Sequence, residues 1–280
     1  MNYRHAYHAG NFADVMKHVV VARILAHLLR KPAPFRFVDT HAGIGLYDLG
    51  AEEARRTGEW QGGVGLMREP FRPEVEELLA PWRGVLRSIR ARYGSDAYPG
   101  SPALAWEMLR PGDRAIFVEK HPEDLAALAA RSQKVPNTKA LHLDGWIALG
   151  SLIPPKERRG LVLIDPPFEE PGEFVRCADR LAAAVRRWPS GIYALWYPIK
   201  AQDEPASLAQ SLAGSIAVRT LRLELTIASA DGSRLAGSGL IVVNPPWTLV
   251  GEMGLLLPAL AERLGKPGAF LCQELVQEGA

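Results

Sequence analysis

The stretch Gly160-Leu161-Val162-Leu163-Ile164-Asp165-Pro166-Pro167-Phe168 joins a short apolar run to a rigid turn. A run without polar residues is typical of a strand buried on both faces, as in a parallel sheet. Asp165 precedes a proline and is therefore extended, and the two prolines stiffen the chain and lack N–H groups. The carbonyl groups of the turn stay free to accept hydrogen bonds from a substrate amine, and Phe168 can stack on a flat base. The alternative is a rigid turn without chemistry.

Other apolar runs predict further strands of the same sheet. They are Phe35–Val38, Arg114–Val118, Thr138–Leu143 and Gly191–Tyr197. Helices are predicted at Asp14–Leu29, with Asp14 as the N-cap, at Pro122–Lys134 and at Glu173–Trp188. Strands that alternate with helices favour an α/β fold with a mostly parallel sheet. Two late runs, Ser215–Ala230 and Ser238–Asn244, predict an antiparallel pair at one edge and bring the sheet to seven strands.

The segment between the first two strands is too long for an ordinary connection. A βαβ unit needs about 30 residues, and the distance from Asp39 to Glu119 is far greater. We therefore predict a small, mainly helical subdomain inserted at residues 49–100, with a helix from Pro81 to Tyr93. Residues 1–48 and 101–280 then form the main domain, in which residues 1–34 are an N-terminal segment and helix.

The composition of the chain excludes several classes of protein. It has 280 residues, of which 48% are hydrophobic and 23% charged, as in soluble globular proteins. No apolar run reaches the roughly 18 residues that span a bilayer, and the N-terminus lacks the apolar core of a signal peptide. Two cysteines, Cys177 and Cys272, cannot form a disulfide framework, so we expect a cytoplasmic protein. The net charge of +2 permits a nucleic-acid partner without requiring one.

Acidic residues follow four of the predicted strands. They are Asp39, Glu119, Asp144 and Asp165. Ligands of open α/β sheets bind beyond the carboxyl ends of the strands, so these carboxylates are expected along one crevice. The alternative is that each acid caps the helix or turn that follows it.

A glycine turn follows the first strand, at Asp39-Thr40-His41-Ala42-Gly43-Ile44-Gly45. It matches neither G-x-G-x-x-G nor the Walker A pattern, which disfavours a dinucleotide or phosphate site. Glycine lets the backbone approach a ligand closely, and Glu119 after the next strand fits an acceptor for ribose hydroxyls. The turn therefore indicates a cofactor site.

Together these motifs resemble a class I methyltransferase, which uses S-adenosylmethionine and modifies an exocyclic amine of a base. In that superfamily Asp/Asn-Pro-Pro-Tyr/Phe marks amino methyltransferases that act on nucleic acids. The chain closely resembles the bacterial RlmJ family over most of its length. The blocks that carry the resemblance are Tyr3–His18, Asp39–Gly43, Tyr98–Pro102, Leu163–Pro167, Tyr193–Pro198 and Asn244–Trp247. The resemblance implies a Rossmann-like methyltransferase fold and methylation of N6 of one adenine in 23S ribosomal RNA, which gives N6-methyladenine and S-adenosylhomocysteine.

The resemblance also implies roles for individual residues. Asp165 and the Pro166 carbonyl would accept the N6 hydrogens, and Phe168 would stack on the base. The family often has Tyr where this chain has Phe168, and both rings can stack. The residues implied at the cofactor are His18, His41, Ser101, Glu119 at the ribose, Asp144 at the adenine amine, Gly145 beside it and Asp165. Tyr3 would contact the RNA.

Three other features admit competing interpretations. His5 and His8 lack the second ligand pair of a zinc site, so we expect no metal.

Arg83, Arg87 and Arg90 share one face of a predicted helix. They form either a phosphate-binding stripe or a solvated surface. Asn244-Pro245-Pro246-Trp247 repeats the Pro-Pro pattern, but it follows the last strand pair. We expect it at the edge of the sheet with a structural or RNA-contacting role.

Alternative functions remain open at this point. The Asp-Pro-Pro-aromatic chemistry would equally suit an amino methyltransferase acting on DNA adenine or on a protein glutamine. A non-catalytic RNA-binding module is a further alternative, which the combination of Asp165, Glu119 and Asp144 disfavours. We expect a monomer, with no membrane association, that acts on 23S rRNA before the subunit is fully assembled.

Overall fold

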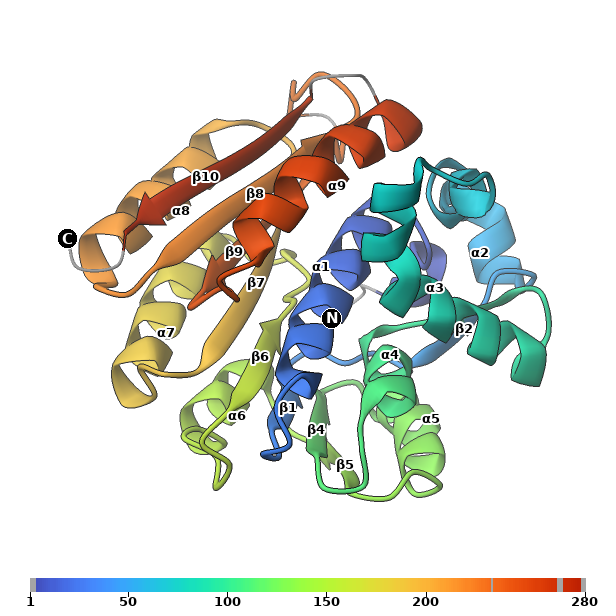
Figure 1. Ribbon diagram of the computed structural model, residues 1–280, viewed down its shortest axis with the longest axis horizontal. Helices are drawn as coiled ribbons and strands as arrows, with labels where there is room; N and C mark the ends of the chain where they lie inside the picture. Colours follow the sequence, from blue (N-terminus) through green and yellow to red (C-terminus); the bar gives the residue numbers. More distant parts are fainter. Residues whose placement is uncertain (1–3, 233, 266–268, 278–280) are drawn as a thin grey trace.

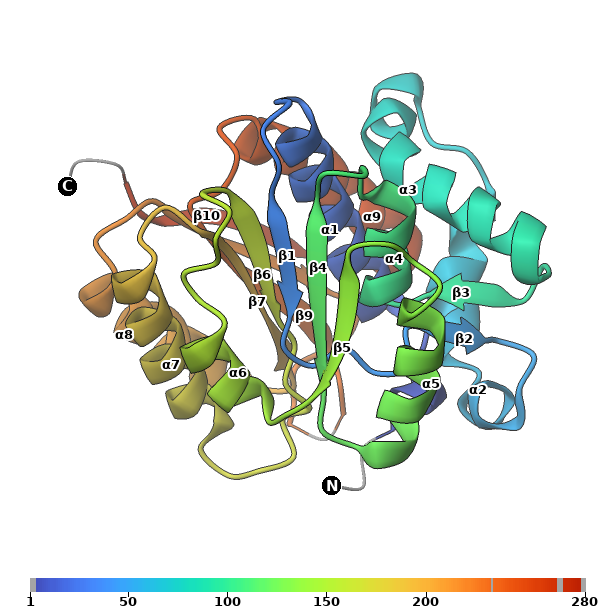
Figure 2. The same cartoon turned by 90° about the horizontal axis from the view of Figure 1, so that it is seen from below.

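The computed structural model describes residues 4–232, 234–265 and 269–277. In these residues, eight strands form one central sheet with the order β10-β8-β9-β7-β6-β1-β4-β5 (Figures 1 and 2). Its strands are β1 (Arg36–Asp39), β4 (Arg114–Glu119), β5 (Thr138–His142), β6 (Gly160–Ile164), β7 (Ile192–Ile199), β8 (Thr220–Thr226), β9 (Gly237–Val243) and β10 (Phe270–Val276). All run in one direction except β9 and β10, which confirms the mostly parallel α/β fold.

The prediction of seven strands was wrong by one. β10 pairs with the outer side of β8, so β8 and β9 lie inside the sheet instead of at its edge. β10 has an irregular burial pattern with few inward-facing apolar positions, which is why its sequence carries no clear strand signal. An edge strand needs only one partner, and its outer face stays in solvent.

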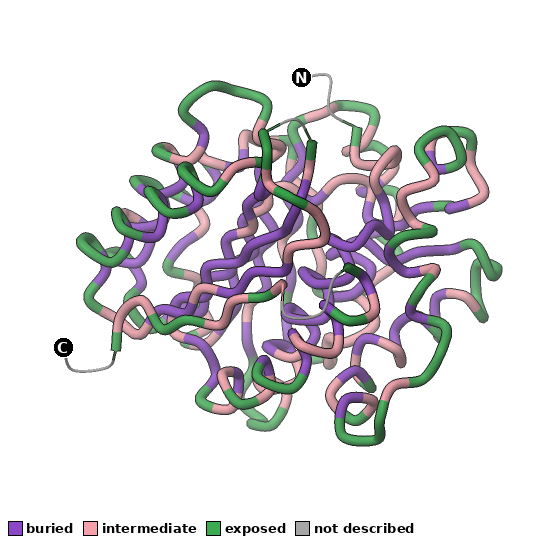
Figure 3. Tube along the Cα trace, turned by 90° about the horizontal axis from the view of Figure 1, so that it is seen from above, coloured by how far each residue is buried: buried purple, intermediate pink, exposed green. Residues whose placement is uncertain are grey.

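Helices cover both faces of the sheet. On one face lie α1 (Phe12–Leu29), α3 (Pro73–Tyr93), α4 (Ser101–Met108), α5 (Pro122–Ser132) and α9 (Leu249–Leu264); on the other lie α6 (Gly145–Ser151), α7 (Glu173–Arg187) and α8 (Asp203–Ser215). Successive strand residues alternate between these layers: Phe37 joins the first core and Val38 the second. Buried residues accordingly run through the sheet and its inner helices, while exposed ones lie on the outer turns (Figure 3). Among the described residues, no helix is both long and apolar enough to cross a membrane.

The first helix, α1, is enclosed by the rest of the first layer. Fourteen of its 18 residues are buried, because it lies between the sheet and the helices α3 and α9. Its N-cap is Asn11, whose side chain accepts from the backbone N–H of Asp14 at 3.0 Å. The prediction that Asp14 is the cap was therefore wrong. Asp14 lies inside the helix, buried, with its carboxylate directed elsewhere.

Residues 49–100 contain short helices and one long one. They are α2 (Glu52–Thr57), η2 (Glu59–Gly62), η3 (Val64–Arg68) and α3. The two strands β2 (Leu46–Asp48) and β3 (Ala97–Pro99) pair at their base, whereas the short helix η1 (His5–Tyr7) belongs to the N-terminal segment before α1. α3 begins at Pro73 and not at Pro81, which lies inside it without ending it. Its apolar face, with Leu79 and Trp82, packs against α1 and α9. The division into a main domain and an inserted subdomain stays a proposal.

Candidate active site

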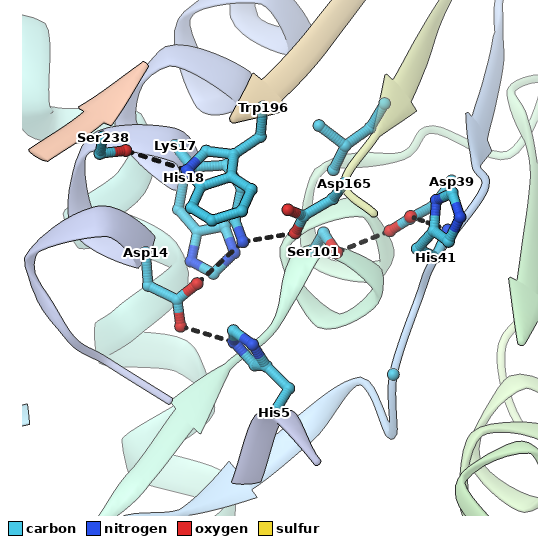
Figure 4. A network of polar contacts seen from close by, with 12 residues as sticks. His5, Asp14, Lys17, His18, Asp39, His41, Ser101, Asp165, Trp196 and Ser238 are labelled. Carbon is cyan, nitrogen blue, oxygen red and sulfur yellow. Dashed lines mark hydrogen bonds and ion pairs between the residues drawn. The ribbon is translucent and has the colours of Figure 1, made fainter. Parts of the chain in front are cut away.

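A cavity of about 1080 Å³ opens at the carboxyl ends of β1, β4, β5 and β6. Its lining includes nine residues expected from the sequence: His18, His41, Ser101, Glu119, Asp144, Gly145, Asp165, Pro166 and Phe168. Tyr3 lies outside the described residues. The cavity thus gathers side chains that are up to 150 positions apart in the chain (Figure 4 shows its polar centre).

The floor of the cavity is the turn after β1, where the strand order of the sheet reverses. The backbone N–H of Thr40 donates to Leu163 O at 3.0 Å, and that of Ala42 to Val118 O at 2.9 Å, so both neighbouring strands hold the turn. Gly145 at the start of α6 approaches this turn closely. A Cβ on Gly145 would lie 2.4 Å from Thr40 O and 2.5 Å from His41 Nε2. Only glycine allows this packing.

Of the four strand-end acids, Asp39 does not line the cavity. It is fully buried and accepts from the Ser101 hydroxyl at 2.6 Å and from the backbone N–H of His41 at 3.2 Å. Burial raises the pKa of Asp39 to about 7, and the charge of Asp165 adds to the effect. Asp39 therefore positions Ser101 and His41, which line the cavity, without lining it itself.

Glu119 and Asp144 line the cavity and also hold backbone groups. Glu119 accepts from the N–H of Gly43 at 2.8 Å and from the N–H of His121 at 2.7 Å. Asp144 caps α6 by accepting from the N–H of Trp146 at 2.9 Å, and its second oxygen lies 3.0 Å from Lys120 Nζ. Burial raises the pKa of Asp144, but the bond from Lys120 and the backbone donors hold it below its usual value. Asp144 therefore caps a helix, as the alternative interpretation of the strand-end acids had it, and it also lines the cavity.

Of the two predicted cofactor histidines, His18 is buried and His41 is half-buried, and both are neutral. Burial lowers the pKa of His18 to about 4 and that of His41 to about 4. His18 Nδ1 lies 2.9 Å from the Tyr98 hydroxyl, and His41 Nδ1 lies 2.9 Å from the Thr40 hydroxyl. Because that hydroxyl donates its proton to Leu163 O, His41 Nδ1–H must be the donor to Thr40, which leaves Nε2 as an acceptor.

Sequence reasoning missed a buried ionic chain beside Asp165. Lys17 Nζ lies 2.5 Å from Asp165 Oδ2 and 2.9 Å from Asp14 Oδ1 (Figure 4). The other oxygen of Asp14 accepts from Gly10 N–H and contacts His5 Nε2, each at 2.9 Å. Burial alone would lower the pKa of Lys17, but the two carboxylates raise it above its usual value. Two opposite charges spaced three apart, Asp14 and Lys17, in a largely apolar helix were the available signal.

The placement of Asp165 follows from strand alternation. Leu161 and Leu163 face the layer that contains α1, so Asp165, two residues further, faces the same way. It thereby contacts Lys17 through Oδ2 and lines the cavity.

Aromatic rings form the wall next to Asp165. Phe168 has a left-handed backbone, with φ of 52°, which is uncommon for a bulky residue and occurs at strained functional turns. Its ring packs against Phe174, with centroids 4.7 Å apart, and meets the ring of Trp196 edge-on at 5.9 Å. Trp196 in turn donates from Nε1 to the Ser238 hydroxyl at 2.9 Å (Figure 4). A carboxylate, a carbonyl and flat apolar rings together suit a planar ring that carries an amine.

The inserted segment holds the N-terminal segment against the site. Glu59 contacts His8 Nδ1 at 2.9 Å and accepts from Asn11 Nδ2 at 3.0 Å, and Val64 N–H donates to Gly10 O at 2.8 Å. Gly63 passes so close that a Cβ would lie 2.1 Å from Gly10 O. These contacts fix the backbone that leads into Asp14 and Lys17.

Two other sequence candidates do not enter the site. Asn244-Pro245-Pro246-Trp247 follows β9, which runs antiparallel to β7, so the turn lies at the opposite end of the sheet and not at its lateral edge. Arg83 donates to Met67 O and to Glu76, which accounts for it structurally, whereas Arg87 is exposed. The described residues contain no group of three or more His, Cys, Asp or Glu placed to hold a metal ion.

Comparison with known proteins gives consistent similarities. Residues 32–275 match the model of a family described as ribosomal RNA large subunit methyltransferase D, RlmJ. The chain is 37% identical over 271 residues to the ribosomal RNA large subunit methyltransferase J of Escherichia coli K12, covering 96% of this chain and 95% of the relative. It is 35% identical to the protein of the same name from Haemophilus influenzae, with the same coverage. A crystal structure of a Legionella pneumophila protein superposes with a TM-score of 0.85 at 30% identity, covering 95% of this chain and 98% of that one.

Proposed function

Because the chain belongs to the RlmJ family of ribosomal RNA large subunit methyltransferases, we propose that it transfers the methyl group of S-adenosylmethionine to N6 of an adenine in 23S rRNA. The observation that carries this proposal is the Asp165-Pro166-Pro167-Phe168 turn. Asp165, Pro166, Pro167 and Phe168 line one cavity with Glu119 and Asp144. The cavity volume of about 1080 Å³ exceeds the roughly 300–1,000 Å³ of most ligand pockets, so a cofactor and a base both fit.

The chain's residues suit S-adenosylmethionine, which when bound supplies an electrophilic methyl group. Glu119 keeps lone pairs for the ribose hydroxyls, since each of its oxygens accepts only one backbone N–H. Asp144, with Gly145 beside it, would bind the cofactor's adenine amine. His18, His41, Ser101 and Asp165 complete the proposed cofactor site. His18 and His41 are neutral there and so add no positive charge next to a sulfonium.

The catalytic task is to make a poor nucleophile reactive. The N6 lone pair of adenine is conjugated into the ring, so acceptors must draw the two N6 hydrogens out of conjugation. Asp165 Oδ1 and the Pro166 carbonyl are the acceptors, and Asp165 receives the proton that nitrogen loses as the new N–C bond forms. Lys17 holds Asp165 Oδ2 and so directs Oδ1 toward the amine.

The target base needs a flat slot outside its own stack. Phe168 would stack on the flipped adenine, and Trp196 supports Phe168 edge-on. Tyr3 is proposed as an RNA contact. We further propose a cytoplasmic monomer that acts on rRNA before subunit assembly is complete, with residues 49–100 as an inserted subdomain.

Radiolabelled methyl transfer tests this function. Deproteinised 23S rRNA from cells that lack the enzyme is compared with matched DNA, a glutamine-containing protein extract and assembled subunits. We expect label in 23S rRNA alone, recovered as N6-methyladenosine after digestion, and none with Asp165→Ala. Label in DNA or protein, or in another nucleoside, would contradict the proposal.

A further inference from the structure

The Pro-Pro turn after β9 presents a tryptophan at the end of the sheet that faces away from the cavity. Asn244, with φ of 51°, donates from Nδ2 to Pro189 O and to Gly191 O, each at 2.7 Å. These bonds and the two prolines fix the turn. Trp247 beyond it is 72% exposed, more than any other large apolar side chain of the described residues. The proposed reaction does not use it.

Positive side chains lie at the same end of the sheet as this tryptophan. The guanidinium of Arg30, at the end of α1, lies 6.0 Å from the ring centre of Trp247, within the range of a cation–π contact. Lys31 follows it, and Lys156 and Arg158 lie in the turn before β6, which starts at the same end of the sheet. All four cations are exposed, and none forms an ion pair with a residue that the structure describes.

The two cationic turns are held together by hydrogen bonds. Arg159 donates to Leu28 O at 2.7 Å and to Ala33 O at 2.8 Å, which ties the turn before β6 to the end of α1. Apart from burial, the charges of Arg30, Arg159 and Lys31 lower the pKa of His27, in keeping with their proximity. The neighbouring carboxylate Glu157 is already paired with Arg36 at 2.9 Å. Positive charge therefore remains in excess.

We propose that this basic face, defined as Arg30, Lys31, Lys156, Arg158 and Trp247, is a second binding surface for the RNA substrate. Its cations would neutralise phosphates, and Trp247 would stack on an unpaired base beside Arg30. Charged residues are depleted from the centres of protein interfaces, whereas unpaired cations around an exposed aromatic ring are what single-stranded RNA requires. The inference rests on the proposed function, because a large rRNA can reach both ends of the molecule.

The two sites are far enough apart to be tested separately. β7 has eight residues, which at about 3.3 Å each span roughly 26 Å between its ends. Substitutions on the basic face should therefore change RNA binding without changing the chemistry in the cavity.

Equilibrium binding of 23S rRNA measures the effect directly. The variants are Trp247→Ala and the double variant Arg30→Gln/Arg158→Gln, with Lys139→Gln/Arg180→Gln as a control of equal charge at other exposed positions. We expect Trp247→Ala to weaken binding roughly 5- to 100-fold and Trp247→Phe to restore most of it. The test double variant should lower the slope of log affinity against log salt by about 1.4–1.8, since each phosphate contributes about 0.7–0.9.

Steady-state kinetics separates this inference from the proposed function. In the Trp247→Ala enzyme, KM for the RNA should rise while kcat at saturating RNA and cofactor affinity by calorimetry stay unchanged. Unchanged RNA affinity, KM and salt slope in an active enzyme would overturn the second surface. A wild-type enzyme that methylates no RNA would instead overturn the proposed function, while the binding assay still tests the surface. Altered self-association with unchanged RNA affinity would assign the face to a protein contact and overturn the inference.

Discussion

Lys17 is a charged side chain inside an apolar helix, and its removal leaves two carboxylates without their shared cation. It is only 4% exposed and contacts Asp14 and Asp165. Lys17→Met should lower the free energy of unfolding by about 3–5 kcal/mol, because breaking a buried ion pair strands the opposite charge. Methyl transfer should fall as well, since Asp165 loses its orientation. Urea denaturation and single-turnover methylation measure the two effects.

Asp14 provides the control for this substitution. Lys17→Met/Asp14→Asn removes one stranded carboxylate, so it should regain part of the lost stability but none of the activity. A Lys17→Met enzyme with full stability and full turnover would show that the buried ionic chain has no role.

Asp39 should make stability depend on pH in an unusual direction. Its pKa is raised to about 7 by burial, so between pH 4 and 7 the folded state binds more protons than the unfolded state. This contribution to stability is present at low pH and is lost as pH rises through 7, by at most about 1.4 kcal/mol per pH unit. His18 and His41, with pKa values lowered from 6.5 to about 4, contribute with the opposite sign between about pH 4 and 6.5.

Comparison with Asp39→Asn isolates that contribution. The variant does not titrate at this position, so its stability relative to the wild type should improve from pH 5 to about pH 7 and level off towards pH 8. Thermal melting at each pH measures the difference. A difference that is independent of pH would mean that Asp39 is ionised throughout this range.

At the scale of elements, α6 approaches the turn after β1 through a single glycine. Gly145→Ala would place a methyl group 2.4 Å from Thr40 O, so α6 or the turn must move, at a cost of about 1–3 kcal/mol. We expect weaker cofactor binding by calorimetry. Gly150, in the same helix, has nothing within 4 Å of an added Cβ, and Gly150→Ala should be neutral or stabilise the helix by up to about 1 kcal/mol. Equal effects of the two substitutions would contradict this account.

The inserted segment acts on the site through Glu59. Loss of its contacts to His8 and Asn11 frees the backbone that leads to Asp14, so Glu59→Ala should lower kcat by roughly 10- to 100-fold, as small misplacements in active sites do. The exposed Glu52, in the same segment, offers a control: Glu52→Ala should leave kcat unchanged.

A double-mutant cycle checks that Glu59 acts through the N-terminal segment. In a His5→Ala background, Glu59→Ala should cause little further loss, because both changes release the same backbone. Fully additive losses would show that Glu59 acts by another route.

At the scale of the whole molecule, an ion pair joins the first helix to the last. Arg23 contacts Glu252 at 2.9 and 2.7 Å across 229 positions of sequence, and both side chains are mostly buried. Glu252→Gln should lower the free energy of unfolding by about 1–3 kcal/mol. Because α1 and α9 share one core, circular dichroism and tryptophan fluorescence should still report one coincident transition. Two separate transitions would show that the ends of the chain unfold independently.

The sequence predicted the parallel core of the sheet well because its strands are continuous apolar runs. Gly160–Ile164 matches β6 in full, and Arg114–Val118 differs from β4 by one residue. The errors occurred where tertiary contacts override local signals. Pro81 was taken as a helix start, yet α3 passes through it because its apolar face is fixed by α1 and α9. β10 was not predicted because an edge strand is partly exposed to solvent, so its sequence has no continuous apolar run.

The sequence predicted the residues of the site that follow strands, but not those that come from other elements. Glu119, Asp144 and Asp165 follow strands, so their shared edge follows from topology. Lys17 and Glu59 come from a helix before the sheet and from the inserted segment, and no periodicity indicates which strand they face. Their positions depend on how whole layers pack, which one sequence without its fold does not reveal.

The enclosure of α1 has a consequence for the order of synthesis. α1 leaves the ribosome well before β9 and α9, which cover part of its apolar surface. Lys17 lacks Asp165 until β6 has emerged, and the side of α1 that packs against α9 stays uncovered until residues up to 264 have emerged. Domains fold as units during translation, so the growing chain cannot assemble this cavity piecewise. We therefore expect no methyl transfer by a chain that is still being synthesised.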